Sequence, residues 1–201
     1  MLGMMILSRV IGGGMALARA ELTGPSLSRL RPKLKQTAFA LWGLYVFLTL
    51  LEFGLLFFTG SMDLFDSINH ALTTMPSGGF STHDASIGFY DSVLVEGIII
   101  IFMFLAGVNF TLLWFIREGD FKRAFGDEEF RNYVTYVTVA FLAIFIALMT
   151  SGYSLGRGLR DGLFQVVSFA TSTGYTSTNY MDESWPLVGH LILFILMVVG
   201  A

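Results

Sequence analysis

Two segments of this chain, far apart in the sequence, have the character of copies of one unit. The first runs from Asp66 to Thr82 and the second from Gly162 to Thr178. Each places a short, moderately apolar stretch before a glycine flanked by serine, threonine and an aromatic residue, and each continues Ser-Thr. Because each segment also lies between two long apolar runs, the order helix, short re-entrant helix, glycine loop, helix is predicted. That order is the plan of a cation-channel pore.

The composition indicates an integral membrane protein. Hydrophobic residues make up 54% of the chain and charged residues 13%, whereas ordinary soluble domains carry about 25% charged residues. The absence of cysteine excludes disulfides and cysteine-ligated metals. The three histidines show no metal-ligand spacing, so we expect no bound cofactor and each histidine in a satisfied or solvated role.

The apolar and charged runs predict an all-α membrane fold built from helix–pore-loop–helix repeats, here incomplete. The first part, residues 1–35, holds the end of one repeat and a basic loop. The second part, residues 36–131, is a whole repeat with helix 37–58, pore helix and loop 63–82, helix 93–116 and loop 117–131. The third part, residues 132–201, is a truncated repeat with helix 133–149, pore helix and loop 155–178, and helix 186–201. That last helix would span about 24 Å of a roughly 30 Å hydrocarbon core, so we expect a fragment of a longer protein.

The basic residues predict the orientation. The loops 19–35 and 117–131 hold nine of the twelve Lys and Arg residues, and the positive-inside rule places both in the cytoplasm. Both glycine loops then open to the outside, and the two repeats run parallel. The first outer segment carries four aspartates without Lys or Arg, which would concentrate cations. The second outer segment has mixed charge, because Arg157 and Arg160 accompany its acidic residues.

The glycine loops suit an ion filter because backbone carbonyls can replace the water shell of a cation. Gly78 and Gly174 are the expected equivalent centres, since glycine turns its carbonyl at no Cβ cost. The short helices before them would aim their negative C-terminal ends at the ion path. Hydroxyl oxygens would support the loops, from Thr73, Thr74, Ser77, Thr171, Ser172 and Thr173. The alternative is that both loops are ordinary turns between apolar helices.

Three polar residues lie within or near the predicted spans. We expect Asn109 to join two helices and Glu96 to lie at the outer interface, whereas Glu52 would need a basic partner that the sequence does not name. The three form no catalytic constellation, so we do not expect an enzyme. A carrier with broken helices is the other transport alternative, although that fold often uses inverted repeats.

The loop motifs resemble a known family. The run from Gly78 to Gly88 closely resembles the second pore loop of the TrkH family of bacterial potassium-uptake membrane subunits, and Thr171–Thr176 resembles the third. The Gly12–Met15 segment resembles the junction between the first two repeats. Members of this superfamily (Trk, Ktr and plant HKT) have four repeats around one pore. The resemblance implies that this chain holds the tail of repeat one, all of repeat two and most of repeat three.

The resemblance also implies a function. It implies a multi-pass protein of the bacterial inner membrane that forms a pore. The implied substrate is potassium, which is taken up by symport. A homodimer and a cytoplasmic nucleotide-binding regulatory subunit of TrkA type are the implied partners, together with the bilayer and without nucleic acid. The implied potassium-binding residues are Thr74, Met75, Pro76, Ser77, Gly78, Thr171, Ser172, Thr173, Gly174 and Tyr175.

Two features qualify that assignment. Met75-Pro76-Ser77 departs from the family pattern, although Pro76 keeps its carbonyl. Glycine at both filter positions favours potassium, because serine there accompanies sodium permeation in the family. A sodium- and potassium-permeable transporter of the same superfamily and a non-conducting structural membrane subunit stay open as alternatives.

Overall fold

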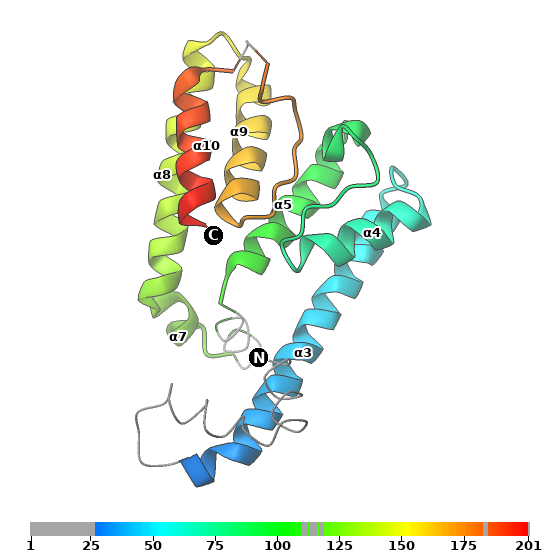
Figure 1. Ribbon diagram of the computed structural model, residues 1–201, viewed down its shortest axis with the longest axis vertical. Coiled ribbons are helices and arrows are strands. Elements are labelled where there is room, and N and C mark those ends of the chain that lie inside the picture. The colour runs from blue at the N-terminus through cyan, green and yellow to red at the C-terminus, as the bar shows by residue number, and fades with distance from the viewer. Residues whose placement is uncertain (1–26, 110–111, 113–115, 117–118, 183–184, 201) are drawn as a thin grey trace. The chain divides into compact units, whose positions relative to one another are not determined.

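Helices account for all the regular structure in the residues that the computed structural model describes, which are 27–109, 112, 116, 119–182 and 185–200 (Figure 1). The all-α prediction is therefore confirmed for this part of the chain. The Gly12–Met15 segment lies outside the described residues. The elements, in chain order, are α3 (Leu27–Phe58), α4 (Leu64–Thr74), the 3-10 helix η1 (Ser86–Tyr90), α5 (Val93–Gly107), α7 (Phe121–Gly126), α8 (Glu128–Thr150), α9 (Leu155–Ala170) and α10 (Leu187–Val199).

The chain divides into two compact units, Met1–Tyr45 and Val46–Ala201. In the first unit, the described part is the beginning of α3, which starts at Leu27 rather than at the expected residue 37. Residues 27–35 are therefore helical, and the expected basic loop is too long at this end. Pro32 lies in the second turn of the helix, where its missing N–H removes one backbone hydrogen bond. The leucines, lysines and arginines around it are good helix formers.

Among the described residues, two helical segments are long and apolar enough to cross a membrane, Ala38–Phe58 and Glu128–Thr150. Helix α5 is apolar but ends at Gly107, so the expected continuous helix 93–116 is wrong. A Cβ at Gly107 would lie 2.9 Å from Thr171 Cγ2 and 2.6 Å from the Tyr133 hydroxyl. The missing side chain thus lets α5 pass close to the end of α9, and the next residue, Val108, is extended.

Helix α8 starts five residues earlier than expected, at Glu128, and the reason is its cap. The Asp127 side chain accepts a hydrogen bond from Phe130 N at 3.1 Å, and Glu128 and Glu129 favour the positive end of the helix. Together with α7, this start makes much of the expected loop 117–131 helical.

Helix α9 is the centre of the second unit and packs against α8, α5 and α10 (Figure 1). Its Phe164 is fully buried with Ile99 of α5 and Ile144 of α8. Many large apolar side chains of α10 are instead exposed, among them Leu187 and Phe194. In a bilayer such side chains meet lipid tails of similar polarity, so packing is the main term that joins the helices.

Candidate functional site

The chain reverses direction at the C-terminal end of α4 through a tight hydrogen-bonded turn. The Thr73 carbonyl accepts from Gly78 N at 2.7 Å and from Gly79 N at 3.3 Å. Ser77 and Gly79 both have positive φ, 55° and 63°. A side chain at either position is strained, so the turn is a specific feature rather than a simple helix end.

The same turn stands at the end of α9. The Ser168 carbonyl accepts from Thr173 N at 2.9 Å and from Gly174 N at 3.3 Å. Ser172 and Gly174 have φ of 55° and 85°. The two loops predicted from the sequence therefore share one backbone geometry.

This geometry corrects the expected register of the two loops. Gly174 corresponds to Gly79, which is 95 positions earlier, and Gly78 corresponds to Thr173. The predicted equivalence of Gly78 with Gly174 is wrong, and Gly79 was missed. In the first loop, either Gly78 or Gly79 could be the equivalent of Gly174. Aligning Ser81-Thr82 with Ser177-Thr178 favoured Gly78, which is the wrong choice. The aromatic residues Phe80 and Tyr175, also 95 positions apart, carried the correct signal.

A side-chain hydroxyl on each short helix holds the end of each loop. Thr73 Oγ1 donates to the Phe80 carbonyl at 2.9 Å, and Ser168 Oγ donates to the Tyr175 carbonyl at 2.7 Å. These donors are again 95 positions apart. Each loop is thus tied at both ends to one turn of its own helix, and its path is fixed locally.

The carbonyls between these ties are left without partners. In the described residues, no hydrogen bond reaches the carbonyl oxygens of 76–79 or of 171–174. Backbone carbonyls in folded proteins are nearly always paired with protein or water. Two sets of consecutive free carbonyls at equivalent positions are therefore available to an external ligand such as a cation.

The second loop packs directly against the first. A Cβ at Gly79 would lie 1.8 Å from the Thr173 carbonyl oxygen, so only glycine permits this approach. Tyr175 is fully buried, and its hydroxyl meets Thr73 Oγ1 and the His70 carbonyl, the latter at 3.3 Å. Burial raises the pKa of Tyr175 to about 12, which keeps the hydroxyl protonated as a donor.

The segment that follows Tyr175 runs along η1. Gly88 N donates to the Thr176 carbonyl at 3.1 Å, and Thr176 N donates to Ser86 Oγ at 3.3 Å. A Cβ at Gly88 would lie 2.6 Å from the Ser177 carbonyl oxygen. The exit of the second loop is therefore held by the segment that follows the first loop.

Asp66 on α4 organises the return of the first loop. Its carboxylate accepts from Thr82 Oγ1 and from the Tyr90 hydroxyl, each at 2.7 Å, and contacts His83 Nε2 at 3.1 Å. Burial by itself raises the pKa of Asp66, but these hydrogen bonds outweigh it and hold the pKa below its usual value. Asp66 therefore acts as an ionised tie between the helix and the segment 82–90.

His70 is buried on the same helix with both ring nitrogens satisfied. Nδ1 lies 2.8 Å from the Asp66 carbonyl, and Nε2 lies 3.0 Å from Ser81 Oγ. Since a carbonyl can only accept, Nδ1 carries the proton and Nε2 accepts from Ser81. Burial lowers the pKa of His70, in accord with a neutral ring in a structural role.

The four aspartates of the first outer segment have different uses. Asp63 caps α4 by accepting from Asp66 N at 2.7 Å, and Asp91 pairs with Arg160 at 2.8 Å. Asp84 is exposed. Three of the four therefore make structural contacts in addition to contributing negative charge.

Arg160 joins α9 to α5, a contact that the sequence did not reveal. Its Nε and Nη2 donate to the two carboxylate oxygens of Glu96 at 2.6 and 2.9 Å. Glu96, expected at the outer interface, is 1% exposed and is the buried partner of this pair. Hydrogen bonding to Glu96 raises the pKa of Arg160. Burial, followed by the charge of Glu96, raises the pKa of the adjacent Asp161.

Asn109 behaves as expected for a helix-joining residue. Its Nδ2 donates to Glu129 Oε2 on α8 at 3.4 Å. This contact links the segment after α5 to the first turn of α8.

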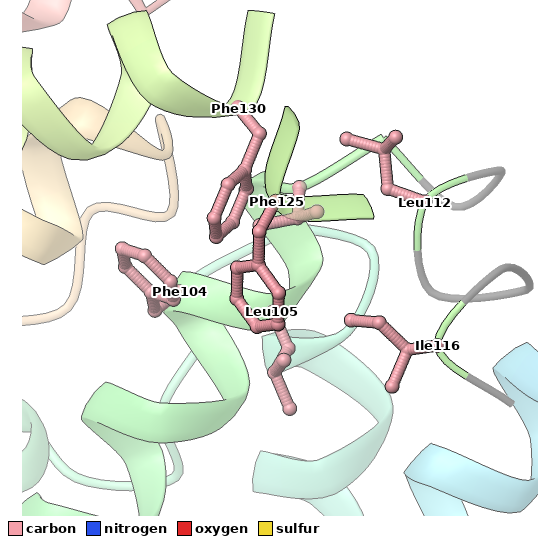
Figure 2. Close-up of a pocket in the computed structure, with 7 residues that line it drawn as sticks. Phe104, Leu105, Leu112, Ile116, Phe125 and Phe130 are labelled. Carbon is pink, nitrogen blue, oxygen red and sulfur yellow. The ribbon is translucent and has the colours of Figure 1, made fainter. Parts of the chain in front are cut away.

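A hollow near the end of α5 offers a contrast to the glycine loops (Figure 2). Three phenylalanine rings and four aliphatic side chains surround it, contributed by Phe104, Leu105, Val108, Leu112, Ile116, Phe125 and Phe130. Because carbon atoms line it, it provides no side-chain oxygen ligand for a cation.

Comparison with known proteins adds independent evidence. The family model described as "TrkH: Cation transport protein" matches residues 2–201. The chain is 38% identical over 200 residues to the Trk system potassium uptake protein TrkH of Escherichia coli K12, and 37% identical over 193 residues to the protein of that name from Halomonas elongata. Each alignment covers 94% of this chain and 39% of the relative, so the chain spans about two fifths of their length.

A solved structure shows the same fold. The crystal structure of the potassium transporter TrkH from Vibrio parahaemolyticus superimposes with a TM-score of 0.77 at 32% sequence identity. The superposition covers 96% of this chain and 40% of that one. The helical arrangement described above thus recurs in an experimentally determined relative.

Proposed function

This chain belongs to the TrkH family of cation transport proteins, and we infer its function from this membership together with the geometry of the two glycine loops. It is accordingly a membrane protein. We propose that it supplies two of the pore loops of a potassium-uptake subunit, in which ions are selected by backbone carbonyls. Potassium is the transported substrate, and no cofactor is needed.

The observation that carries this proposal is the pair of equivalent free carbonyl sets at 76–79 and 171–174. Each set follows the C-terminal end of a short helix, where the helix dipole favours a cation. A dehydrated cation needs several oxygen ligands at once, and rows of carbonyls provide them. Two ordinary turns between apolar helices would not be expected to have positive φ at equivalent positions and to pack against each other.

The proposed filter residues are those expected from the sequence, with one addition and three changes of role. The carbonyls of Pro76, Ser77, Gly78 and the added Gly79 form the first set, and those of Thr171, Ser172, Thr173 and Gly174 form the second. Thr74 and Tyr175 act through their buried side chains, which support the loops from behind. Met75 is buried at the helix end and has a structural role.

We further propose an inner-membrane location with the segments 19–35 and 117–131 in the cytoplasm and both glycine loops facing outside. The distribution of Lys and Arg supports this orientation. In cysteine variants of the full-length protein in intact cells, K33C and K122C should resist a membrane-impermeant thiol reagent, whereas S86C should react. Labelling of K122C from outside would overturn the orientation. The name "Trk system" of the relatives supports further subunits, for which we propose a second copy of the protein and a TrkA-type regulatory subunit.

The test of function is ion flux. The full-length protein that contains this segment should take up potassium in preference to sodium when reconstituted in liposomes. Residues 1–201 alone should show no flux above empty vesicles, because two loops leave part of the coordination shell open. Equal potassium and sodium flux in the full-length protein would favour the sodium- and potassium-permeable alternative, and no flux would favour a non-conducting subunit.

A further inference from the structure

His70 and Gln165 are buried polar side chains at equivalent positions of the two short helices α4 and α9. They are 95 positions apart, as are Gly79 and Gly174, and neither side chain has any exposed surface. Glutamine is mostly exposed in folded proteins, because burial of a polar group costs free energy unless that group is hydrogen-bonded. Two buried polar side chains at one position of a repeated structure therefore point to a shared role.

The His70 ring connects α4 to the exit of the first loop. Its Nε2 accepts a hydrogen bond from Ser81 Oγ at 3.0 Å, and its Nδ1 donates to the Asp66 carbonyl at 2.8 Å. Ser81, two residues after Gly79, in turn accepts at Oγ from His83 N at 3.2 Å. The hydrogen bonds thus run in one direction, from the returning chain through the Ser81 hydroxyl and the ring to the helix.

Gln165 makes the corresponding connection in the second loop. Its Nε2 donates to the Thr178 carbonyl at 3.3 Å, and Thr178 lies on the segment that leaves this loop. The equivalent of Ser81 is Thr176, so the contact of Gln165 is two residues further along the exit. The bonded atoms differ between the loops, but both side chains join the same helix position to the returning chain.

These two contacts hold the loops at the end that the helix turns do not reach. The start of each loop is fixed by the Thr73 or the Ser168 carbonyl at the end of its helix, and the free carbonyls of 76–79 and 171–174 lie between that start and the exit. If the exit moved, the peptide units between the two fixed points would rotate and their carbonyls would turn. Displacement by about 0.5 Å is enough to disturb a binding geometry, and a carbonyl filter depends on how its oxygens surround the ion.

We propose that His70 and Gln165 are positioning residues of the two filter loops, His70 through Ser81 and Gln165 through Thr178. Each side chain keeps the exit of its loop against the helix, so that the free carbonyls keep the direction that a bound ion requires. Both act through the loop backbone and not as ion ligands. This role rests on the proposed function of the loops.

Substitutions of His70 test the role through ion selectivity of the reconstituted full-length protein. H70L removes the acceptor for Ser81 and should lower potassium-to-sodium discrimination about fivefold, the effect of one lost buried hydrogen bond. H70Q introduces the side chain that the second loop uses, retains an acceptor and should keep most of the discrimination. H70N should resemble H70L, because its shorter amide is expected to bond to its own helix, as Asn69 does to the Phe65 carbonyl.

Substitutions of the partners complete this test. S81A should lower discrimination by a similar factor to H70L, whereas S81T retains the hydroxyl and should keep the discrimination. The double variant H70L/S81A should be no worse than the more affected single variant, since both changes remove the same hydrogen bond. S61A makes the same change at an exposed serine and is the matched control. In the second loop, Q165M keeps an unbranched side chain without a donor and should also lower discrimination.

The contact between His70 and Ser81 can be tested without ion flux. Nitrogen NMR of the full-length protein with isotope-labelled histidine should show a neutral ring with its proton on Nδ1, and this signal should be absent from H70Q. S81A should shift the Nε2 resonance of this ring, whereas S61A should leave it in place. A proton on Nε2, or a charged ring, would overturn the contact.

Several results would contradict the positioning role. A lower melting temperature with unchanged discrimination in H70L and S81A would show that the contact only stabilises the fold. Losses that multiply in the double variant would show that the two residues act separately, and unchanged discrimination in Q165M would overturn the assignment of Gln165. A wild type without potassium flux would instead contradict the proposed function, and the nitrogen spectra would still decide on the contact.

Discussion

The two glycine loops have the same backbone but different neighbours. Gly79 and Gly174 both have positive φ, yet a Cβ at Gly79 would collide with the Thr173 carbonyl, whereas a Cβ at Gly174 would meet nothing within 4 Å. Tyr175 is fully buried, whereas its equivalent Phe80 is 75% exposed. The helix before each loop therefore determines the backbone conformation of that loop. The packing between the loops adds contacts that are not symmetric, because Tyr175 is buried and Phe80 is exposed.

The helices that carry the loops differ in the same way. Arg160 ties α9 to α5 through buried Glu96, whereas the equivalent residue on α4 is Phe65, which is 66% exposed. Helix α4 relies instead on the Asp63 cap and on Asp66. The difference indicates that the second loop is held by helix–helix contacts and the first by contacts with its own return segment and with the second loop.

Loss of Arg160 should have the largest effect on stability. Arg160→Ala leaves the Glu96 carboxylate buried without its partner, which costs about 3–5 kcal/mol. Thermal unfolding of the full-length protein in detergent measures this loss. Phe65→Ala, at the equivalent exposed position, is the control and should change stability little. Equal losses in the two variants would show that the helices are anchored alike.

Gly79→Ala should have the next largest effect. The new Cβ would lie 1.8 Å from a backbone oxygen, and the positive φ adds strain, so we expect a loss of about 3 kcal/mol. The discrimination between potassium and sodium should fall with it. Gly174→Ala should cost only the backbone strain, about 1 kcal/mol.

Gly174→Ser extends that comparison to function. The side chain has space, so the fold should survive, while the strain of a serine at positive φ should change the conformation of the proposed filter loop. We expect looser discrimination between potassium and sodium in uptake assays. Unchanged selectivity in Gly174→Ser would remove Gly174 from the filter.

The aromatic pair should show a smaller contrast. Tyr175→Phe keeps the ring but removes the hydroxyl that joins the two loops, which should cost about 1 kcal/mol. Phe80→Ala removes an exposed ring, so within residues 1–201 we expect a change below about 0.5 kcal/mol. A larger loss in the full-length protein than in residues 1–201 would show that Phe80 packs against a part of the protein beyond this chain.

The smallest expected effect on stability concerns Asp66 and its equivalent Asp161. The pKa values of these two carboxyl groups shift in opposite directions. The pKa of Asp66 is lower in the folded state, so its stabilising contribution is present above the ordinary value of 3.8 and is lost as the pH falls below it. The pKa of Asp161 is raised, so its ionised form destabilises the fold at neutral pH and this penalty disappears on acidification. Melting temperatures across pH should therefore fall for D66N at neutral pH but not for D161N. A fall for both would contradict the opposite shifts.

Sequence patterns alone predicted the helical class, the two short helices α4 and α9 and the position of both glycine loops. Apolar run length, a short stretch with a glycine after it, and the Ser and Thr content are local properties, and local rules determine such elements. The same rules misplaced the start of α3 and the end of α5. Helix ends depend on caps and on close contacts such as that of Gly107 with Thr171.

Only the tertiary structure decided the register and the contacts. The residues after the glycines offered two conflicting signals, the aromatic residues and the Ser-Thr pairs. The positive φ of Gly79 and its close approach to Thr173 identify Gly79 rather than Gly78 as the equivalent of Gly174. The Arg160–Glu96 pair and the burial of Tyr175 beneath Thr73 join residues far apart in the chain. The amino-acid sequence by itself therefore determined which residues form each loop, since a loop is a local structure. Which atoms the loops bring together depended on packing between distant segments, and that packing exists only in the folded chain.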